Sequence, residues 1–222
     1  MKVLLFGYKG KIGSIVLEKL EAEGASVIKV EKEDSLLDNN LQNTTFAIDF
    51  SDAKESLKHA VVCNNNNIPL LICTTGQTEK QISKMQKIKA TVPIVVCHNT
   101  SRGTGIILKI LKSLERNIFD SAHIHEIHNK NKKDTPSGTA LMLQQALKNQ
   151  NISCVITSER TNHNIISNVV KLFLDNEILE IKHVATSKEL FADGAIEIAK
   201  ELKTLPPKVY INTIFRGLYE AN

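Results

Sequence analysis

The chain contains no tryptophan, and aromatic residues make up only 5% of its 222 positions. Its core must therefore rest on isoleucine, leucine and valine, and an apolar fraction of 42% is enough to build one. No run of about 18 apolar residues occurs, so we expect no membrane-spanning helix. The apolar run at residues 2–6 leads directly into Gly7 without the cleavage site of a secretory signal, and it predicts a buried first strand.

The chain also has few cysteines and only a small net charge. None of the four cysteines belongs to a CxxC pair, which favours buried, reduced thiols in a cytoplasmic protein over a disulfide framework. The histidines at positions 123, 125 and 128 fit no common zinc spacing, so no metal site is expected. A net charge of +4 favours an anionic ligand, but the basic stripe of a nucleic-acid-binding protein is missing.

The first hundred residues alternate between short apolar runs and segments with helical spacing. Strands are expected at residues 2–6, 26–30, 46–50, 68–75 and 92–99, with helices between them. This alternation is typical of βαβ units around a parallel sheet whose two faces are covered. The sequence therefore predicts an α/β fold with a Rossmann-type, doubly wound sheet.

The pattern changes after Asn99. Residues 104–117 have the spacing of an amphipathic helix, and another helix is expected from about Thr139 to Asn149. Four later segments alternate with a period of two, as strands of a sheet with one open face do: residues 122–128, 153–157, 168–175 and 178–186. A second domain of the α+β class is therefore expected.

The turn after the first strand reads Gly7-Tyr8-Lys9-Gly10-Lys11-Ile12-Gly13. Glycines let backbone N–H groups approach a pyrophosphate, and the following helix start adds partial positive charge. The spacing is GxxGxxG rather than the usual GxGxxG, so a turn that needs glycine only for packing remains the alternative.

Three further places at the ends of strands are candidates for cofactor contacts. Glu31 stands where an acidic side chain would bond the ribose of NAD, and Lys32 could accept the extra phosphate of NADP. Both could instead be plain surface charge. The loops at residues 73–76 and 97–101 offer hydroxyl and amide groups where ligands of open α/β sheets bind, although each could be an ordinary turn.

The segment from Glu126 to Ala140 carries the residue types of a carboxylate site. His128 titrates near neutrality and can exchange a proton, while Lys132 can supply charge and a proton. Ser137 or Gly138 stands at a helix start, where the first-turn N–H groups have no partner within the helix. The alternative is a solvated basic loop before a capped helix.

This segment, EIHNKNKKDTPSGTAL, resembles the signature of the dihydrodipicolinate reductases, E-x-H-H-x-x-K-x-D-x-P-S-G-T-A. The matching residues are Glu126, His128, Lys132, Asp134, Pro136, Ser137, Gly138, Thr139 and Ala140. The resemblance covers nearly the whole chain. Other matches in order and spacing are Gly7-x-x-Gly10-x-x-Gly13, Asp49-Phe50-Ser51, Thr74-Thr75-Gly76, Asn99-x-Ser101-x-Gly103 and Phe191-Ala192-Asp193-Gly194-Ala195.

The resemblance implies both an architecture and a reaction. Residues 1–100 together with 192–222 would form a dinucleotide-binding domain, and residues 101–191 a domain for substrate binding and oligomerisation, assembled as a homotetramer. The reaction would be reduction of 4-hydroxy-tetrahydrodipicolinate by NADH or NADPH with loss of water. This is a step of lysine and diaminopimelate biosynthesis in the cytoplasm.

The resemblance also assigns roles to residues. His128 corresponds to the family's acid/base histidine and Lys132 to its proton-donating lysine. Substrate contacts are expected from Asn129, Ser137, Gly138, Thr139 and Lys188. Cofactor contacts are expected from Gly7, Tyr8, Lys9, Gly10, Lys11, Ile12, Glu31, Lys32, Cys73, Thr74, Thr75, Cys97, His98, Asn99 and Thr100.

Several positions depart from the family pattern. Asn129 replaces a second histidine, so it can donate a hydrogen bond but carries no charge. Cys73 replaces a glycine, Thr100 an aromatic residue and Lys188 a common arginine. The family's R-x-G-x-x-x-G-E-H stretch is not recognisable around residues 160–170. These departures bear on kinetics and oligomer contacts more than on the type of reaction.

Two other functions remain open at this point. A different NAD(P)-dependent dehydrogenase of the same architecture is one; a semialdehyde dehydrogenase would need a nucleophilic cysteine in the second domain, where only Cys154 lies. A non-catalytic dinucleotide sensor is the other, and it would bind the cofactor without turnover.

Overall fold

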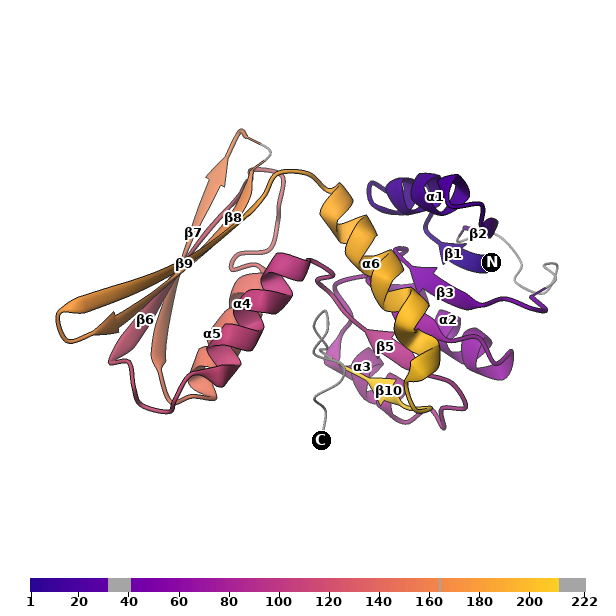
Figure 1. Cartoon of the computed structure of the whole chain (residues 1–222). Helices are drawn as coiled ribbons and strands as arrows, with labels where there is room; N and C mark the ends of the chain where they lie inside the picture. Colours follow the sequence, from indigo (N-terminus) through magenta and orange to yellow (C-terminus); the bar gives the residue numbers. More distant parts are fainter. Residues whose placement is uncertain (32–40, 164, 212–222) are drawn as a thin grey trace. The chain divides into compact units, whose positions relative to one another are not determined.

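The computed structural model describes residues 1–31, 41–163 and 165–211 (Figure 1). The chain divides into two units: Met1–Ser101 with the chain from Glu189 onward, and Arg102–Lys188. The chain returns to the first unit at Glu189, where helix α6 begins, whereas the sequence-based boundary was residue 192. None of the described helices has the length and apolar character that a bilayer span requires.

The described residues of the first unit form a six-stranded sheet in which every pairing is parallel. Its strands are β1 (Lys2–Phe6), β2 (Ser26–Val30), β3 (Phe46–Asp49), β4 (Leu70–Ile72), β5 (Ile94–Val96) and β10 (Val209–Tyr210). Their order is β10-β5-β4-β3-β1-β2, so the chain reverses direction across the sheet between β1 and β3. Such a switch point is where open α/β sheets bind ligands, at the carboxyl ends of the strands.

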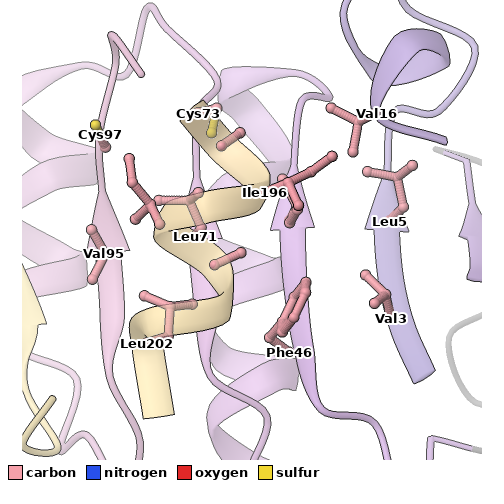
Figure 2. Close-up of a cluster of buried hydrophobic side chains, with 14 of the residues drawn as sticks. Val3, Leu5, Val16, Phe46, Leu71, Cys73, Val95, Cys97, Ile196 and Leu202 are labelled. Carbon is pink, nitrogen blue, oxygen red and sulfur yellow. The ribbon is translucent and has the colours of Figure 1, made fainter. Parts of the chain in front are cut away.

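Helices cover both faces of this sheet. They are α1 (Gly13–Ala22), α2 (Ala53–Asn65), α3 (Glu79–Gln86) and α6 (Glu189–Glu201), followed by a short 3-10 helix, Leu202–Thr204. Alternate residues of each buried strand feed two separate apolar layers, so Leu5 packs with Val16 and Ile196 on one face (Figure 2). Leu4 packs with Ala60 and Met85 on the other. The predicted doubly wound α/β fold is confirmed, and two buried faces explain why its strands are apolar throughout.

The second unit contains a four-stranded mixed sheet with the order β7-β6-β8-β9. Its elements are α4 (Arg102–Ser113), β6 (Ser121–Asn129), α5 (Gly138–Lys148), β7 (Ser153–Thr161), β8 (Ile166–Leu174) and β9 (Glu177–Ala185). β6 and β7 are parallel and α5 connects them, while β8 pairs antiparallel with β6 and with β9. The predicted second α+β domain is therefore present.

The two faces of the second sheet differ. Every second residue of β6 is buried on the face that α4 and α5 cover (Figure 1). The opposite face leaves apolar side chains exposed, among them Val155 of β7 and Ile178 of β9 at 66% and 63%. The period-two pattern thus corresponds to one covered and one open face.

Candidate active site

The turn after β1 is so closely packed that two of its positions require glycine. Gly7 has a φ of +75°, and a Cβ there would lie 2.6 Å from the carbonyl carbon of Phe50, just beyond β3. A Cβ on Gly13 would lie 2.1 Å from the carbonyl oxygen of Gly7. Packing alone thus accounts for these two glycines. Ile12 caps α1 without a side-chain hydrogen bond, so the helix start also suits an anion.

The predicted cofactor residues of this turn lie at its surface or just below it. Gly7, Tyr8 and Ile12 are half-buried, while Lys9, Gly10 and Lys11 are exposed. Lys9 donates a 2.6 Å hydrogen bond to the carboxylate of Glu31, which directly follows β2, and this bond raises the pKa of Lys9. The acidic group thus stands at the end of the second strand, as a ribose contact requires. Lys32 lies outside the described residues.

Asp49 joins the loops that leave β3 and β4. Its buried Oδ1 accepts hydrogen bonds from the backbone N and Oγ of Ser51, at 2.8 and 2.6 Å, and from Oγ1 of Thr74 at 3.0 Å. Its Oδ2 lies 3.0 Å from Nδ1 of His59, whose ring stacks on Phe6. A single buried carboxylate thus ties the loop after β3 to the predicted ligand loop after β4.

Gln77 joins the loops after β4 and β5. Its amide nitrogen donates to the carbonyl oxygen of Thr74 at 2.9 Å and to Oγ of Ser56 at 3.1 Å. Its Oε1 accepts a 3.0 Å hydrogen bond from Nε2–H of His98. Because burial lowers the pKa of His98, the ring is neutral near pH 7 and its Nδ1 is an acceptor.

Three predicted cofactor residues direct their side chains into the unit. Cys73 and Cys97 belong to the apolar layer beside α6 (Figure 2). Burial raises the pKa of both thiols, to about 12 for Cys97. Thr100 donates a 2.6 Å hydrogen bond to the carbonyl oxygen of Phe191. In this conformation these three residues offer a cofactor their backbone, whereas the side chain of Thr75 is exposed.

In the second unit, strand register gathers polar side chains on the covered face of the sheet. Glu126 of β6 lies opposite Ser158 of β7 and Asn168 of β8, and His128 lies opposite Arg160. Residues directly opposite each other on neighbouring strands share a face. Glu126 and His128 are 0% and 6% exposed, so this polar group lies within the unit rather than in a solvated loop.

Glu126 is the centre of this group. Both of its oxygens lie 3.1 Å from the backbone N of Ser137, and Oε1 also accepts from Oγ of Ser158 at 2.7 Å and Nη2 of Arg160 at 3.1 Å. Burial by itself would raise the pKa of Glu126, but these hydrogen bonds outweigh it and hold the pKa below the usual value. We refer to Glu126, His128, Ser137, Ser158 and Arg160 as the Glu126 cluster.

His128 belongs to this cluster, and Lys132 lies near it on the loop before α5. Nε2 of His128 lies 3.4 Å from Oε2 of Glu126. Burial lowers the pKa of His128, the charge of Glu126 opposes that shift, and the charge of Lys132 adds to it. Nζ of Lys132 forms a 2.9 Å ion pair with Asp134. The structure thus brings the two predicted catalytic residues within electrostatic reach of each other.

Helix α5 begins next to the cluster. Ser137 is its N-cap, and its Oγ accepts a 3.2 Å hydrogen bond from the backbone N of Ala140. Gly138 is exposed, and a Cβ there would meet no atom within 4 Å, while Thr139 is half-buried. Space therefore remains beside Gly138, at the first turn of a helix start of the kind that binds carboxylates.

The two remaining predicted substrate residues lie apart from the cluster. Asn129 ends β6, where its Oδ1 accepts from the backbone N of Asn131 at 3.0 Å and its Nδ2 donates to the carbonyl oxygen of His163 at 3.4 Å. Lys188 is exposed just before α6. Within the described part of the chain, no hydrogen bond or ion pair ties Lys188 to the Glu126 cluster.

Sequence reasoning missed the central place of Glu126 and the contributions of Ser158 and Arg160. One signal for Glu126 was present, because residues two apart on a strand share a face, which pairs it with His128. Ser158 and Arg160 are 32 and 34 positions from Glu126, and no local pattern predicts their approach.

The cysteine of the second unit does not suit a nucleophile. Burial raises the pKa of Cys154, and its thiol donates to the neighbouring carbonyl oxygen of Val155. A nucleophilic cysteine needs a lowered pKa. The semialdehyde dehydrogenase alternative therefore loses its required residue.

Comparisons with known families cover both units. The family model described as "Dihydrodipicolinate reductase, N-terminus" matches residues 1–100, and "Dihydrodipicolinate reductase, C-terminus" matches residues 103–213. A 4-hydroxy-tetrahydrodipicolinate reductase of Thermosipho africanus is 32% identical, over 90% of each chain. One of Brachyspira hyodysenteriae is 33% identical, over 95% of this chain and 97% of its own.

Solved structures add the fold. A dipicolinate-bound dihydrodipicolinate reductase from Paenisporosarcina sp. TG-14 superposes with a TM-score of 0.76 at 16% identity, covering 96% of this chain and 97% of its own. An aspartate semialdehyde dehydrogenase II of Vibrio cholerae reaches a TM-score of 0.60 at 10% identity, covering 90% and 97%, and shares the fold alone. From the two family matches and from relatives more than 30% identical over nearly the full length, we conclude that the chain belongs to the dihydrodipicolinate reductase family.

Proposed function

We propose that this chain catalyses the reduction of 4-hydroxy-tetrahydrodipicolinate to tetrahydrodipicolinate by NADH or NADPH, in lysine and diaminopimelate biosynthesis. The observation that carries the proposal is the placement of His128 and Lys132 beside the start of α5, in a chain whose relatives bear this activity in their names. An acid/base group, a cation and the backbone amide groups of a helix start are what the reduction of an anionic ring requires.

The first unit fits a dinucleotide. The turn at residues 7–12 would hold the pyrophosphate, because the helix start behind it has no side-chain cap. Glu31 would accept the hydrogen bonds of the ribose, and its pairing with Lys9 places a cation nearby for an extra phosphate. The loops that Asp49 and Gln77 hold together would line the nicotinamide end. When bound, the nicotinamide supplies the hydride.

The second unit would hold the substrate. The backbone N–H groups of Gly138 and Thr139 and the hydroxyl-bearing cap at Ser137 would bind one carboxylate, with Lys132 as the counter-charge and proton donor. His128 would exchange a proton with the ring. Asn129 and Lys188 would supply a hydrogen bond and a second cation if they approach the bound substrate.

We further propose that the protein works in the cytoplasm as a homotetramer, and the open face of the second sheet supports its assembly. Val155, Ile178 and Val184 are exposed at 66%, 63% and 42% on this face. Exposed apolar side chains gathered on one face of a sheet are typical of protein interfaces. Light scattering of the purified protein tests the oligomer, and a monomer at micromolar concentration would contradict it.

The reaction is tested by coupling the purified protein to dihydrodipicolinate synthase and following oxidation of NADH and of NADPH separately. Lys132→Ala and His128→Gln are expected to lower kcat by about 10²–10⁴-fold while cofactor affinity is retained. Lys133→Ala is the matched control, because Lys133 is an exposed lysine next to Lys132 and should leave kcat unchanged. Full activity of Lys132→Ala would refute its role, and cofactor binding without turnover by the wild type would favour a sensor.

A further inference from the structure

Glu126 is the most deeply buried charged group of the second unit for which the proposed reaction supplies no role. Its side chain is 0% exposed, on the same face of β6 as His128. A carboxylate in such a place costs several kcal/mol unless several donors surround it. Glu126 has donors from two elements, Ser137 at the start of α5 and Ser158 and Arg160 on β7. Nε2 of His128, on its own strand, lies 3.4 Å away without a hydrogen bond.

The placement of the His128 ring follows from this arrangement. Nε2 is buried and faces the carboxylate, so it is not the nitrogen that exchanges a proton with a substrate. Nδ1 is the ring nitrogen that remains for exchange. At 3.4 Å without hydrogen-bond alignment, the contact between Glu126 and His128 is mainly electrostatic, and it strengthens when the ring takes up a proton.

Arg160 connects the same carboxylate to the loop that carries Lys132. Its Nη2 donates to Oε1 of Glu126 at 3.1 Å, to the carbonyl oxygen of Asp134 at 2.7 Å and to Oγ1 of Thr135 at 2.9 Å. Glu126 and Arg160 together therefore touch each part of the proposed substrate site: the imidazole, the lysine loop and the start of α5.

We propose that Glu126 is a positioning residue for the reaction. Glu126 orients the His128 ring with Nδ1 toward the substrate and holds this ring against the start of α5, and Arg160 is the counter-charge of Glu126. This inference rests on the proposed function. The charged groups that face His128 are Glu126 on its own strand, Arg160 on β7, and Lys132 and Asp134 on the loop before α5. Glu126 and Asp134 favour the protonated ring, and the two cations disfavour it.

The test replaces Glu126 by glutamine, which keeps the shape and removes the charge. In Glu126→Gln, the limb of the kcat–pH profile governed by His128 should move to lower pH by about one unit, because an opposite charge at this range shifts a pKa by about 1–3 units. The NMR titration of His128 should move in the same direction without substrate. A fall in kcat of at least about tenfold, with the Kd for NADH unchanged, is expected alongside.

The matched control is Glu159→Gln. Glu159 lies 3.4 Å from Nε2 of His125, the same separation as in the Glu126–His128 pair, but on the open face of the sheet. Its loss should leave the His128 titration in place. Should Glu126→Gln fail to fold, Arg160→Gln replaces it as the test. Loss of the Arg160 cation should raise the pKa of His128, so the NMR titration should move to higher pH rather than lower.

A folded Glu126→Gln protein with an unmoved His128 titration and pH profile would overturn the proposal. So would an Arg160→Gln protein whose titration moves to lower pH. The NMR titration uses no substrate, so it separates the two levels of inference. An inactive wild type with the expected NMR shifts would refute the reaction and leave the control of His128 by Glu126 standing.

Discussion

The sharpest consequence of the fold concerns Gly13, the last glycine of the turn after β1. A Cβ at this position would lie 2.1 Å from the carbonyl oxygen of Gly7 and 3.1 Å from the Cα of Tyr8. Ordinary contact begins at 3.4 Å, and both neighbours are backbone, which cannot rotate away as a side chain can. Gly13→Ala must therefore push the turn away from the start of α1.

The cost can be bounded from these contacts. Overpacking of a rigid neighbour typically destabilises a protein by about 1–3 kcal/mol, and the backbone contact places Gly13→Ala at the upper end. For a chain of this size, we expect Tm to fall by about 5–10 °C. Since the displaced turn is the proposed pyrophosphate site, the Kd for NADH should rise at least about tenfold, which corresponds to about 1.4 kcal/mol.

Thermal unfolding and fluorescence titration with NADH measure the two effects. Gly10→Ala is the graded comparison: its Cβ would lie 3.2 Å from the same oxygen of Gly7, so it should cost less than about 1 kcal/mol. Ser14→Ala, on the exposed side of α1, should change neither quantity. A Gly13→Ala protein with wild-type Tm and wild-type NADH affinity would refute the packing argument.

Two further predictions concern acid stability and the substrate. Burial lowers the pKa of His98, His128 and His183, so below about pH 6.5 the unfolded chain binds protons that the folded chain resists. The free energy of unfolding, measured by denaturant titration, should therefore decrease as pH falls from 7 to 5. His98→Gln should make this dependence on pH weaker. A free energy of unfolding that increases as pH falls would count against these burial effects. Gly138→Ala should change stability by less than about 0.5 kcal/mol, because its Cβ meets no atom within 4 Å. Its KM for the dicarboxylate should rise while the Kd for NADH stays constant, and an unchanged KM would argue against the amide site.

The spacing of apolar residues predicted a strand or helix well where the apolar run has the same bounds as the element. Residues 2–6 and 26–30 form β1 and β2 with the expected bounds. The expected strands at 68–75 and 92–99 are shorter, Leu70–Ile72 and Ile94–Val96. Their apolar runs continue past the strand ends because Cys73 and Cys97 are buried against α6 without extending the sheet. An apolar run therefore marks the residues that are buried, and here the buried stretch is longer than the paired strand.

The sequence by itself determined the fold class, the glycine turn, and the order of His128, Lys132 and Ser137 before α5, because each depends on residues close together in the chain. Only the tertiary structure decided which side chains meet at Glu126. Ser158 and Arg160 reach it through the parallel register of β6 and β7, which depends on how the whole sheet packs against its helices. The tertiary structure also decided that the side chains of Cys73, Cys97 and Thr100 point inward, because their inward packing depends on α6, the helix with which the chain returns to the first unit.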